Sequence, residues 1–257
     1  MTQQTIRQRA RAGDTILGAM VFEFFSPGMA RIAEEAGCEF ILYDMEHSGL
    51  SIETLKLMHA SARGLSIAPM ARVPRGEYHF LARALDVGMH GVMVPMVESV
   101  DEARAIAEAT HYPPAGRRGA GFGFAHDGYA AGDVGKKMQA LDARNLVIAQ
   151  IETERGLAAV EEIAAVDGID VLWLGHFDLT NFLGIPAQFD HRLFTSAVAR
   201  IVAAARRHGK GLGFMSGDPA ATTRFRDLGF NMLAAGTDPA IMIGGLRSIL
   251  SPARTTA

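Results

Sequence analysis

Two acidic residues, Glu152 and Asp178, each stand just after a short apolar run that is typical of a buried strand. If these strands are parallel neighbours, the two carboxylates meet at one end of a sheet and could hold a hard divalent cation. Their oxygen atoms suit magnesium or manganese better than the histidine and cysteine ligands of structural zinc do. We therefore predict a metal site with open positions for water or substrate oxygens. The alternative is that both residues only cap helices.

Three further polar residues end predicted strands and could act beside such an ion. Arg72 is a permanent charge after an apolar run, and because burying an unpaired guanidinium is costly, it must pair with an acid or with an anionic ligand. His47 titrates near neutrality when unperturbed, so it is a candidate proton carrier, and Asp44 could orient its ring if the chain bends after Asp44. A solvated loop histidine is the alternative. His126 and His176 lie in loops that we expect to face the same site.

The positions of the lysines argue against a Schiff-base mechanism. Such a lysine must project from the C-terminal end of a strand, whereas Lys56 lies in a predicted helix, Lys136 and Lys137 in a long loop, and Lys210 just before a strand. Polarisation of a carbonyl group therefore falls to the metal. Residues 175–178 could open a helix, and the free amides there would favour a carboxylate group.

The scaffold that must position these residues is visible as a repeating pattern along the chain. Short apolar runs alternate with longer amphipathic segments, at residues 15–23, 40–44, 67–73, 91–97, 146–151, 171–175, 212–215 and 232–235. Helical signals fill the intervals, including Ser51 ahead of Leu55 and the spacing of apolar residues in 153–165. Strands joined by helices run parallel, so we predict an α/β fold of the closed (β/α)8 barrel type.

Chain length and glycine pattern favour this barrel over an open sheet. The 257 residues match the roughly 250 of one barrel, so a single domain over residues 1–257 is expected. An open doubly wound sheet is the competing architecture, but no predicted strand is followed by a G-x-G-x-x-G turn. One connection is unusually long, because a glycine-rich segment at 112–127 separates a helix ending near Thr110 from the strand at 146–151. Such loops are usually functional or disordered.

Composition limits the kinds of partner and the cell compartment. The formal net charge is −3 with acids and bases mixed, which gives no basic stripe for nucleic acid and no polybasic membrane patch. Residues 1–14 lack the apolar stretch of a signal peptide, and no run approaches the roughly 18 to 20 apolar residues of a membrane span. Cys38 is the only cysteine, so no internal disulfide can form. We expect a cytoplasmic protein that acts on a small molecule.

Several short segments, taken together, resemble the HpcH/HpaI aldolase family of metal-dependent class II pyruvate aldolases, such as 4-hydroxy-2-oxoheptanedioate aldolase and 2-dehydro-3-deoxyglucarate aldolase. The matching runs span most of the chain in the expected order. They are DMEH at 44–47, ARVP at 71–74, LDVG at 85–88, VPMV at 94–97, GRRG at 116–119, QIET at 150–153 and GHFDL at 175–179. Their combination is specific, although each run alone is not.

The resemblance implies a modified barrel of the phosphoenolpyruvate/pyruvate superfamily type, whose last helix packs in a partner subunit. The expected assembly is a homohexamer, built as a trimer of dimers. By the same likeness, Glu152 and Asp178 would bind a divalent ion such as magnesium, manganese or cobalt. Arg72 would stabilise the enolate oxygen, and His47 with Asp44 would manage proton transfer.

The resemblance also implies where the substrate lies. Gln150 would lie beside the metal, and the backbone amides of Gly175, His176 and Phe177 would bind the pyruvate carboxylate. Family members place an acid that matches Asp86 near a neighbouring subunit's site. The family commonly has a proline and a small residue after the glycine, so the two bulky residues here should alter the shape of the pocket. This departure bears on the acceptor substrate more than on the metal chemistry.

The expected activity is reversible cleavage of a 4-hydroxy-2-oxo acid into pyruvate and an aldehyde, through an enolate of pyruvate. Its small-molecule partners would thus be a 2-oxo acid and an aldehyde. One alternative is decarboxylation of oxaloacetate, which passes through the same enolate and needs no aldehyde pocket. A second is an acyl-CoA lyase, which needs a cationic groove for which Arg117 and Arg118 are the compact candidates. A binding barrel without catalysis is the third.

Overall fold

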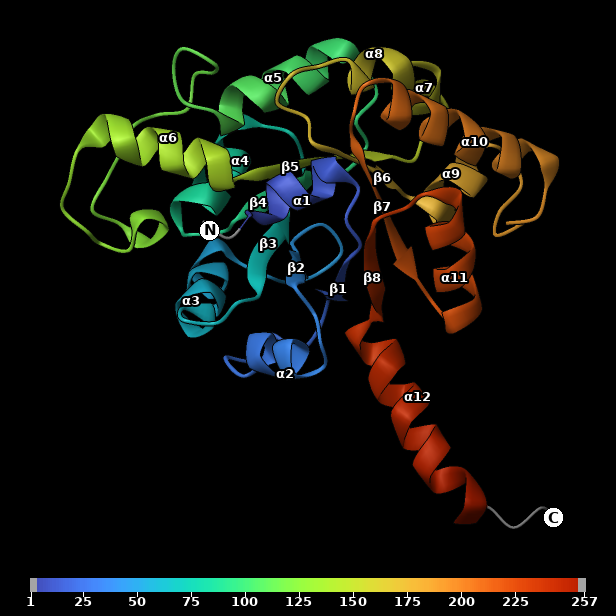
Figure 1. Ribbon diagram of the computed structural model, residues 1–257. Helices are drawn as coiled ribbons and strands as arrows, with labels where there is room; N and C mark the ends of the chain where they lie inside the picture. Colours follow the sequence, from blue (N-terminus) through green and yellow to red (C-terminus); the bar gives the residue numbers. More distant parts are fainter. Residues whose placement is uncertain (1–3, 254–257) are drawn as a thin grey trace.

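The computed structural model describes residues 4–253 and contains a closed barrel of parallel strands in the order β1 to β8 (Figure 1). The strands are β1 Ile16–Val21, β2 Phe40–Asp44, β3 Ala68–Arg72, β4 Gly91–Val94, β5 Leu146–Ile151, β6 Val171–Leu174, β7 Gly211–Ser216 and β8 Met232–Thr237. β1 pairs with β8 and thereby closes the barrel. The predicted fold is confirmed.

The strand predictions differ from the structure mainly at the end of β4. Residues 40–44 and 146–151 agree at both ends with β2 and β5. The predicted strand 91–97 stops at Val94, because Pro95 has no N–H to donate and Met96 has a φ of 53°. A positive φ is uncommon for a residue with a side chain, and this one lies at the end of the barrel where the polar residues gather.

Helices follow the strands as the alternating pattern predicts. They are α1 Ile6–Ala12, α2 Met29–Glu35, α3 Ile52–Ala62, α4 Tyr78–Asp86, α5 Val100–Thr110, α6 Val134–Arg144, α7 Glu154–Ala158, α8 Val160–Ala164, α9 His176–Phe182, α10 Arg192–Arg207, α11 Pro219–Leu228 and α12 Asp238–Leu250, with short turns η1 Ala125–Asp127 and η2 Ser251–Ala253. Ser51 caps α3 by accepting a hydrogen bond from the Thr54 N–H. The helical spacing in 153–165 corresponds to two short helices, because Ala159 leaves the helical conformation (φ −93°, ψ 7°) between α7 and α8.

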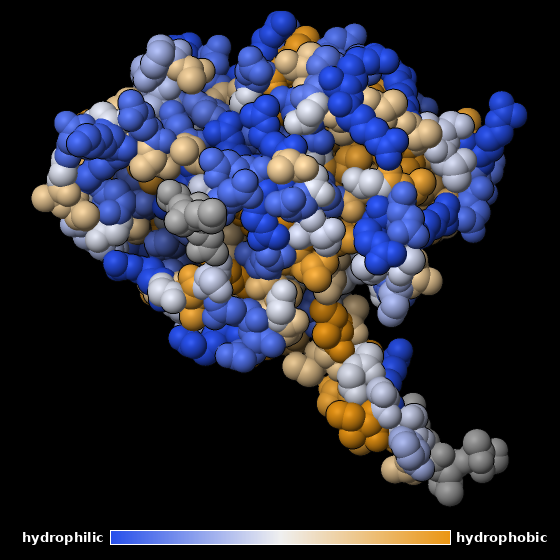
Figure 2. All heavy atoms as spheres, viewed as in Figure 1, coloured by the Kyte–Doolittle hydropathy of each residue, from blue (hydrophilic) through white to orange (hydrophobic). Residues whose placement is uncertain are grey.

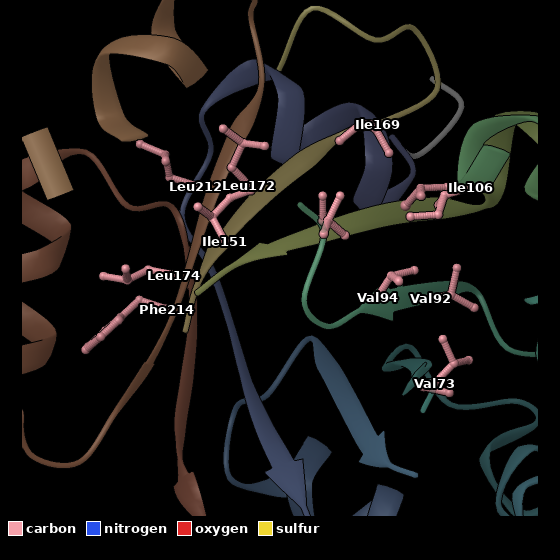
Figure 3. Close-up of a cluster of buried hydrophobic side chains, with 14 of the residues drawn as sticks. Val73, Val92, Val94, Ile106, Ile151, Ile169, Leu172, Leu174, Leu212 and Phe214 are labelled. Carbon is pink, nitrogen blue, oxygen red and sulfur yellow. The ribbon is translucent and has the colours of Figure 1, made fainter. Parts of the chain in front are cut away.

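Side chains on the strands alternate between two packed layers. One layer fills the barrel interior and takes residues from every strand except β7, whose Met215 packs against its edge: Ile16, Met20, Phe40, Leu42, Ala68, Met70, Met93, Leu146, Ile148, Val171, Trp173, Met232 and Ala234. The other layer lies between strands and helices and includes Val92, Val94, Ile151, Leu172, Leu174 and Phe214 (Figure 3). The barrel is therefore a solid core.

The inward alternation continues into polar residues at the C-terminal ends of the strands. Asp44 follows Phe40 and Leu42 at a spacing of two, and Gln150 follows Ile148 in the same way. The period of two therefore directs these polar side chains toward the barrel axis. Active sites of such barrels lie at this end.

The long segment between α5 and α6 lies at the opposite end of the barrel. Its η1 turn contains His126, whose Nδ1 lies 3.2 Å from the main-chain oxygen of Asp86 at the end of α4. Arg144, which ends α6 just before β5 begins, donates a hydrogen bond to the His126 carbonyl. The expectation that His126 faces the same site as Glu152 is therefore wrong, since a segment between a helix and the next strand lies at the N-terminal ends of the strands.

The last helix, α12, extends away from the barrel (Figure 1). Exposed hydrophobic side chains lie along part of it, beside more polar ones (Figure 2), and Ile249 is 77% exposed. Within residues 4–253, no helix has the length and hydrophobicity that crossing a membrane requires.

The barrel interior is packed so closely that β7 requires a glycine. Trp173 lies edge-on to Phe40 with ring centroids 6.4 Å apart. A Cβ at Gly213 would overlap the indole, with Trp173 Cδ2 only 2.7 Å away. Gly217, a few residues further along, has nothing within 4 Å of such a Cβ.

We predict that Gly213→Ala lowers the free energy of unfolding by about 1–3 kcal/mol, because the added methyl group overpacks the core. Gly217→Ala is the matched control and should leave stability unchanged. Urea unfolding followed by tryptophan fluorescence measures both, since Trp173 is the only tryptophan in the chain. Equal stabilities of the two variants would contradict this account of the interior.

Candidate active site

A buried arginine forms the centre of the polar cluster at the C-terminal ends of the strands. Arg72 Nε donates to Asp44 Oδ1 at 2.5 Å, and Arg72 Nη1 lies 3.0 Å from Glu46 Oε2. Asp44 is fully buried, and Arg72 is 6% exposed. The guanidinium also lies over the Phe22 ring, 5.4 Å from its centroid. Two carboxylates thus pair with the guanidinium, in agreement with the sequence argument that this buried charge needs an acidic partner.

The contact between Asp44 and His47 differs from the expected one. Asp44 Oδ2 accepts from the main-chain N–H of His47 at 2.7 Å, and Oδ1 accepts from the N–H of Glu46 at 3.2 Å. The chain does bend after Asp44, as required, but the carboxylate holds the backbone and Arg72 rather than the imidazole. The His47 ring is 59% exposed, and its Nε2 lies 3.6 Å from Glu46 Oε2. Glu46 is therefore the acid closest to the proton-carrying candidate.

Glu152 is a buried carboxylate with both oxygens engaged. It is 2% exposed; its Oε1 accepts from the main-chain N–H of Met96 at 2.7 Å, and its Oε2 accepts from Gln150 Nε2. Burial raises the pKa of Glu152 to about 7, and the negative charges of Glu46 and Asp178 add to this rise. Burial likewise raises the pKa of Glu46, against the pull of Arg72. Three carboxylates thus crowd together at the ends of β2, β5 and β6.

The approach of α9 to β5 depends on a glycine. A Cβ at Gly175 would overlap Glu152 Oε2 and lie 2.9 Å from Gln150 Nε2. Because glycine stands there, α9 begins directly above the Glu152 carboxylate, and Asp178 comes in the first turn of this helix. The sequence prediction that Glu152 and Asp178 meet at one end of the barrel agrees with this arrangement.

His176 and Phe177 fill the start of α9 with aromatic bulk. The His176 ring centroid lies 4.5 Å from that of Phe177, 4.9 Å from that of Phe214 and 5.3 Å from that of Phe189. Burial lowers the pKa of His176 to about 4, so its ring is neutral at neutral pH. Phe177 is more than half exposed. His176 is therefore at the expected end of the barrel but lies within an aromatic cluster.

Asp86 is not brought to the cluster within this chain. It ends α4 at the far end of the barrel, where its Oδ1 forms a 2.8 Å ion pair with Arg118 Nη2. The Arg118 side chain is fully buried and lies over the Tyr112 ring, 4.7 Å from the centroid. Arg118 therefore cannot line an open cationic groove of the kind that an acyl-CoA ester needs. The place of Asp86 beside a neighbouring subunit's site stays a prediction.

The donor set at this end of the barrel suits a hard cation that keeps open positions. Residues 4–253 contain no group of three or more histidine, cysteine, aspartate or glutamate side chains placed to hold a metal. A protein cage is thus absent from the described part of the chain, but the crowded carboxylates repel one another and a cation would relieve that repulsion. Gln150 Oε1 is a buried oxygen without a hydrogen-bond partner among the described residues, which adds an acceptor beside Glu152.

A model of the HpcH/HpaI aldolase/citrate lyase family matches residues 19–244, which include every polar residue of this cluster. The chain belongs to this family. The resemblance seen in the short sequence runs is thereby confirmed. Aldolases of the family are generally dependent on a divalent metal.

Relatives with named activities cover nearly the whole chain. A hydroxypyruvate/pyruvate aldolase of Paraburkholderia phytofirmans is 34% identical over 254 residues, which are 97% of each chain. A 2-keto-3-deoxy-L-rhamnonate aldolase of Salmonella gallinarum is 31% identical and covers 95% of this chain and 91% of its own. The crystal structure of an HpcH/HpaI aldolase from Desulfitobacterium hafniense superposes with a TM-score of 0.93 at 25% identity, over 99% of this chain and 98% of that one. The chain is an enzyme of the class II pyruvate aldolase type.

Two residues of the cluster, Glu46 and Met96, have contacts that their residue types do not predict. Glu46 is visible in the sequence as part of the DMEH run, but the run does not reveal that its carboxylate reaches Arg72. Met96 contributes only its main-chain N–H, which donates to Glu152 Oε1, and its φ is positive. A main-chain donor carries no side-chain signal, so no pattern of residue types could have identified it.

We predict that, in buffer with a chelator, the metal-free protein loses stability relative to Glu152→Gln as the pH rises. The unfolded glutamate titrates near 4.5 and the folded one near 7, so the folded state holds this proton more tightly. The resulting stability is fully present below pH 4.5 and is lost as the pH reaches about 7, by up to about 3 kcal/mol. Urea unfolding at a series of pH values measures the difference. The exposed Glu154→Gln is the control, and a difference that does not change with pH would refute the prediction.

Proposed function

We propose that this enzyme reversibly cleaves a 4-hydroxy-2-oxo acid into pyruvate and an aldehyde, with a divalent ion at Glu152 and Asp178. The observation that carries this proposal is the burial of Glu152 beside the partly exposed Glu46 and Asp178. Burial raises the pKa of Glu152 to about 7, the two neighbouring negative charges add to the rise, and a cation would relieve the repulsion. Magnesium, manganese or cobalt would fit oxygen donors of this kind. When bound, the ion would supply polarisation of the 2-oxo group.

Arg72 supplies the second source of positive charge in this proposal. Asp44 and Glu46 hold its guanidinium in place before any substrate arrives, so no reorganisation is needed when negative charge develops on the substrate oxygen. The remaining N–H groups of the fork would donate to that oxygen. Lysine has no fork and could not keep both carboxylate contacts and the substrate contact.

His47 moves the proton of the 4-hydroxyl group in this proposal. Its ring is largely exposed at the barrel mouth, and its Nε2 lies 3.6 Å from Glu46 Oε2. The main-chain N–H groups of Gly175, His176 and Phe177 would bind the carboxylate of the 2-oxo acid, and Gln150 would lie beside the ion. The aromatic cluster around His176 would form a wall of the pocket for the aldehyde.

The names of the relatives support pyruvate as the shared product, since they include hydroxypyruvate/pyruvate aldolases. Other relatives are named for different sugar-acid substrates, such as 2-keto-3-deoxy-L-rhamnonate. Of the two arginines that an acyl-CoA lyase could use for its cationic groove, Arg118 is buried and only Arg117 is exposed, so this alternative has less support. Decarboxylation of oxaloacetate uses the same enolate and is therefore tested beside the aldol reaction.

We predict that the protein releases pyruvate from 4-hydroxy-2-oxo acids when magnesium, manganese or cobalt is present, and that a chelator abolishes the release. Glu152→Gln and Asp178→Asn should lose both ion binding and turnover. Arg72→Gln should lower kcat by about 10²- to 10³-fold, and Arg72→Lys by less, because one charged donor to the developing oxyanion is removed or displaced. A coupled lactate dehydrogenase assay measures the pyruvate formed.

Glu154→Gln is the control for this series, because Glu154 lies exposed in α7 close to the site in sequence. Pyruvate release from oxaloacetate alone, with none from any aldol, would replace the aldolase by a decarboxylase. Ion binding without any turnover would indicate a binding barrel. Thermal unfolding of each variant separates loss of chemistry from loss of folding.

We further propose that α12 packs against a second copy of the chain, within a trimer of dimers. Ile241, Met242, Ile243, Leu246, Ile249 and Leu250 of this helix are exposed hydrophobic residues. An apolar groove of about 650 Å³ lies between α10 and α11, lined by Phe194, Val198, Val202, Phe225 and Leu228. An apolar helix that leaves its own barrel and an apolar groove that remains open support an exchange between copies. The same assembly would bring Asp86 near a neighbouring site.

We predict that Ile249→Asp lowers the oligomer mass, because a charge at the most exposed apolar position of α12 cannot be buried in the groove. Ser248→Asp adds the same charge to the same helix at a polar residue and is the control. Light scattering coupled to size-exclusion chromatography measures both masses. An unchanged mass for Ile249→Asp would mean that α12 does not hold the subunits together.

A further inference from the structure

A cavity of about 500 Å³ lies at the N-terminal end of the barrel, opposite the candidate active site. It is formed between α3, η1 and α6 and includes residues just before β3, β4 and β5. Its wall gathers His59, Arg63, His90, His126, Lys137 and Arg144. In barrels of this type, residues at this end usually serve stability, so a concentration of basic side chains there needs another explanation.

One acidic residue, Asp127, also lines this cavity, and both of its carboxylate oxygens already accept hydrogen bonds. Asp127 Oδ2 accepts from Lys137 Nζ and from the Gly123 N–H, each at 2.7 Å, and Oδ1 accepts from the Tyr129 N–H at 3.2 Å. Burial opposes its ionisation, but the hydrogen bonds from Gly123 and Lys137 lower the pKa of Asp127 to about 2. Asp127 therefore neutralises Lys137 and leaves the two arginines of the wall uncompensated.

Neither arginine has a carboxylate partner within residues 4–253. Arg63 lies over the Tyr129 ring, 5.6 Å from its centroid. Arg144 donates to the His126 carbonyl at 3.0 Å and makes only long contacts, 3.3 and 3.4 Å, with Asn145 Oδ1. Burial lowers the pKa of Arg144 to about 10. Arg63 is exposed, whereas Arg144 is half-buried. A half-buried guanidinium without an acid is costly, and an anion in the cavity would remove that cost for Arg144.

The histidines add hydrogen-bonding groups that lack partners. His59 is 7% exposed and His126 is 2% exposed, yet His59 Nδ1 and His126 Nε2 have no hydrogen-bond partner among the described residues. Burial lowers the pKa of both rings. His126 donates from Nδ1 to the Asp86 carbonyl, so its Nε2 carries an N–H only when the ring is protonated, and the negative charge of an anion in the cavity would favour that form. His90, 6.3 Å from His59 between ring centroids, completes the group. Because two guanidinium groups share the wall, the ligand is an anion and not a metal cation.

We propose that this cavity binds a small anion with two or more oxyanion charges, such as a phosphate ester or a polycarboxylate, at a site separate from the active site. Arginine forks match such groups with paired hydrogen bonds, and the imidazoles would supply further donors if anion binding protonates them. The volume falls in the range of small-molecule sites, roughly 300–1,000 Å³. The proposal does not depend on the reaction at the other end of the barrel.

Isothermal titration calorimetry tests this site on the metal-free protein, at constant ionic strength set with chloride. Pyrophosphate and citrate are the probes, and they distinguish phosphate from carboxylate ligands. We expect saturable binding of one probe per chain, weakened at least tenfold in Arg63→Gln and in Arg144→Gln. Arg104→Gln, which removes an exposed arginine of α5, is the matched control and should bind as the unmodified protein does.

The candidate active site also contains an arginine, so Arg72→Gln decides where the probe binds. Retained affinity in Arg72→Gln supports the proposal, and its loss would place the anion at the active site and overturn it. Arg144 contacts the η1 backbone, so circular dichroism checks that Arg144→Gln folds. If it does not fold, the affinities of Arg63→Gln and His90→Phe test the site instead. Absence of saturable heat with both probes, or unchanged affinity in Arg63→Gln and His90→Phe, would also overturn the proposal.

Discussion

The burial of the Glu152 carboxylate is the constraint on which the surrounding structure depends. A carboxylate removed from water needs donors for both oxygens, and here they come from the Met96 backbone and the Gln150 amide. The first requires a main-chain turn with positive φ at the end of β4, and the closeness of α9 requires Gly175. Strain and tight packing at the barrel mouth thus serve to hold one acid in a place where it resists ionisation.

Arg72 balances this accumulation of negative charge from the neighbouring side of the barrel. Asp44 and Glu46 hold it, but Glu46 is itself in the field of Asp178 and Glu152, so the cationic and acidic parts of the mouth form one electrostatic unit. A change at any member therefore alters the ionisation of the others. Such coupling is common where a protein prepares a site for a charged ligand.

The sequence predicted the parts of the molecule that follow from periodicity. A period of two within the strands and the alternation of strands with helices determine the barrel, and they also direct Asp44 and Gln150 inward. Atomic partners in irregular segments carry no such period, so the sequence did not reveal that Asp44 binds the His47 backbone rather than its ring. The predicted placement of His126 was wrong. Its loop connects a helix to the next strand, and such a loop lies at the N-terminal ends of the strands, opposite the candidate active site.

Gly175 has a consequence for how this barrel can diverge. A Cβ at this position would overlap Glu152, so a side chain could be added there only if the acid moved. The two positions that follow are not restricted in this way, and this chain has already used them for a histidine and a phenylalanine. The shape of the substrate pocket can therefore change one residue away from this tightly packed glycine, without displacing the Glu152 carboxylate.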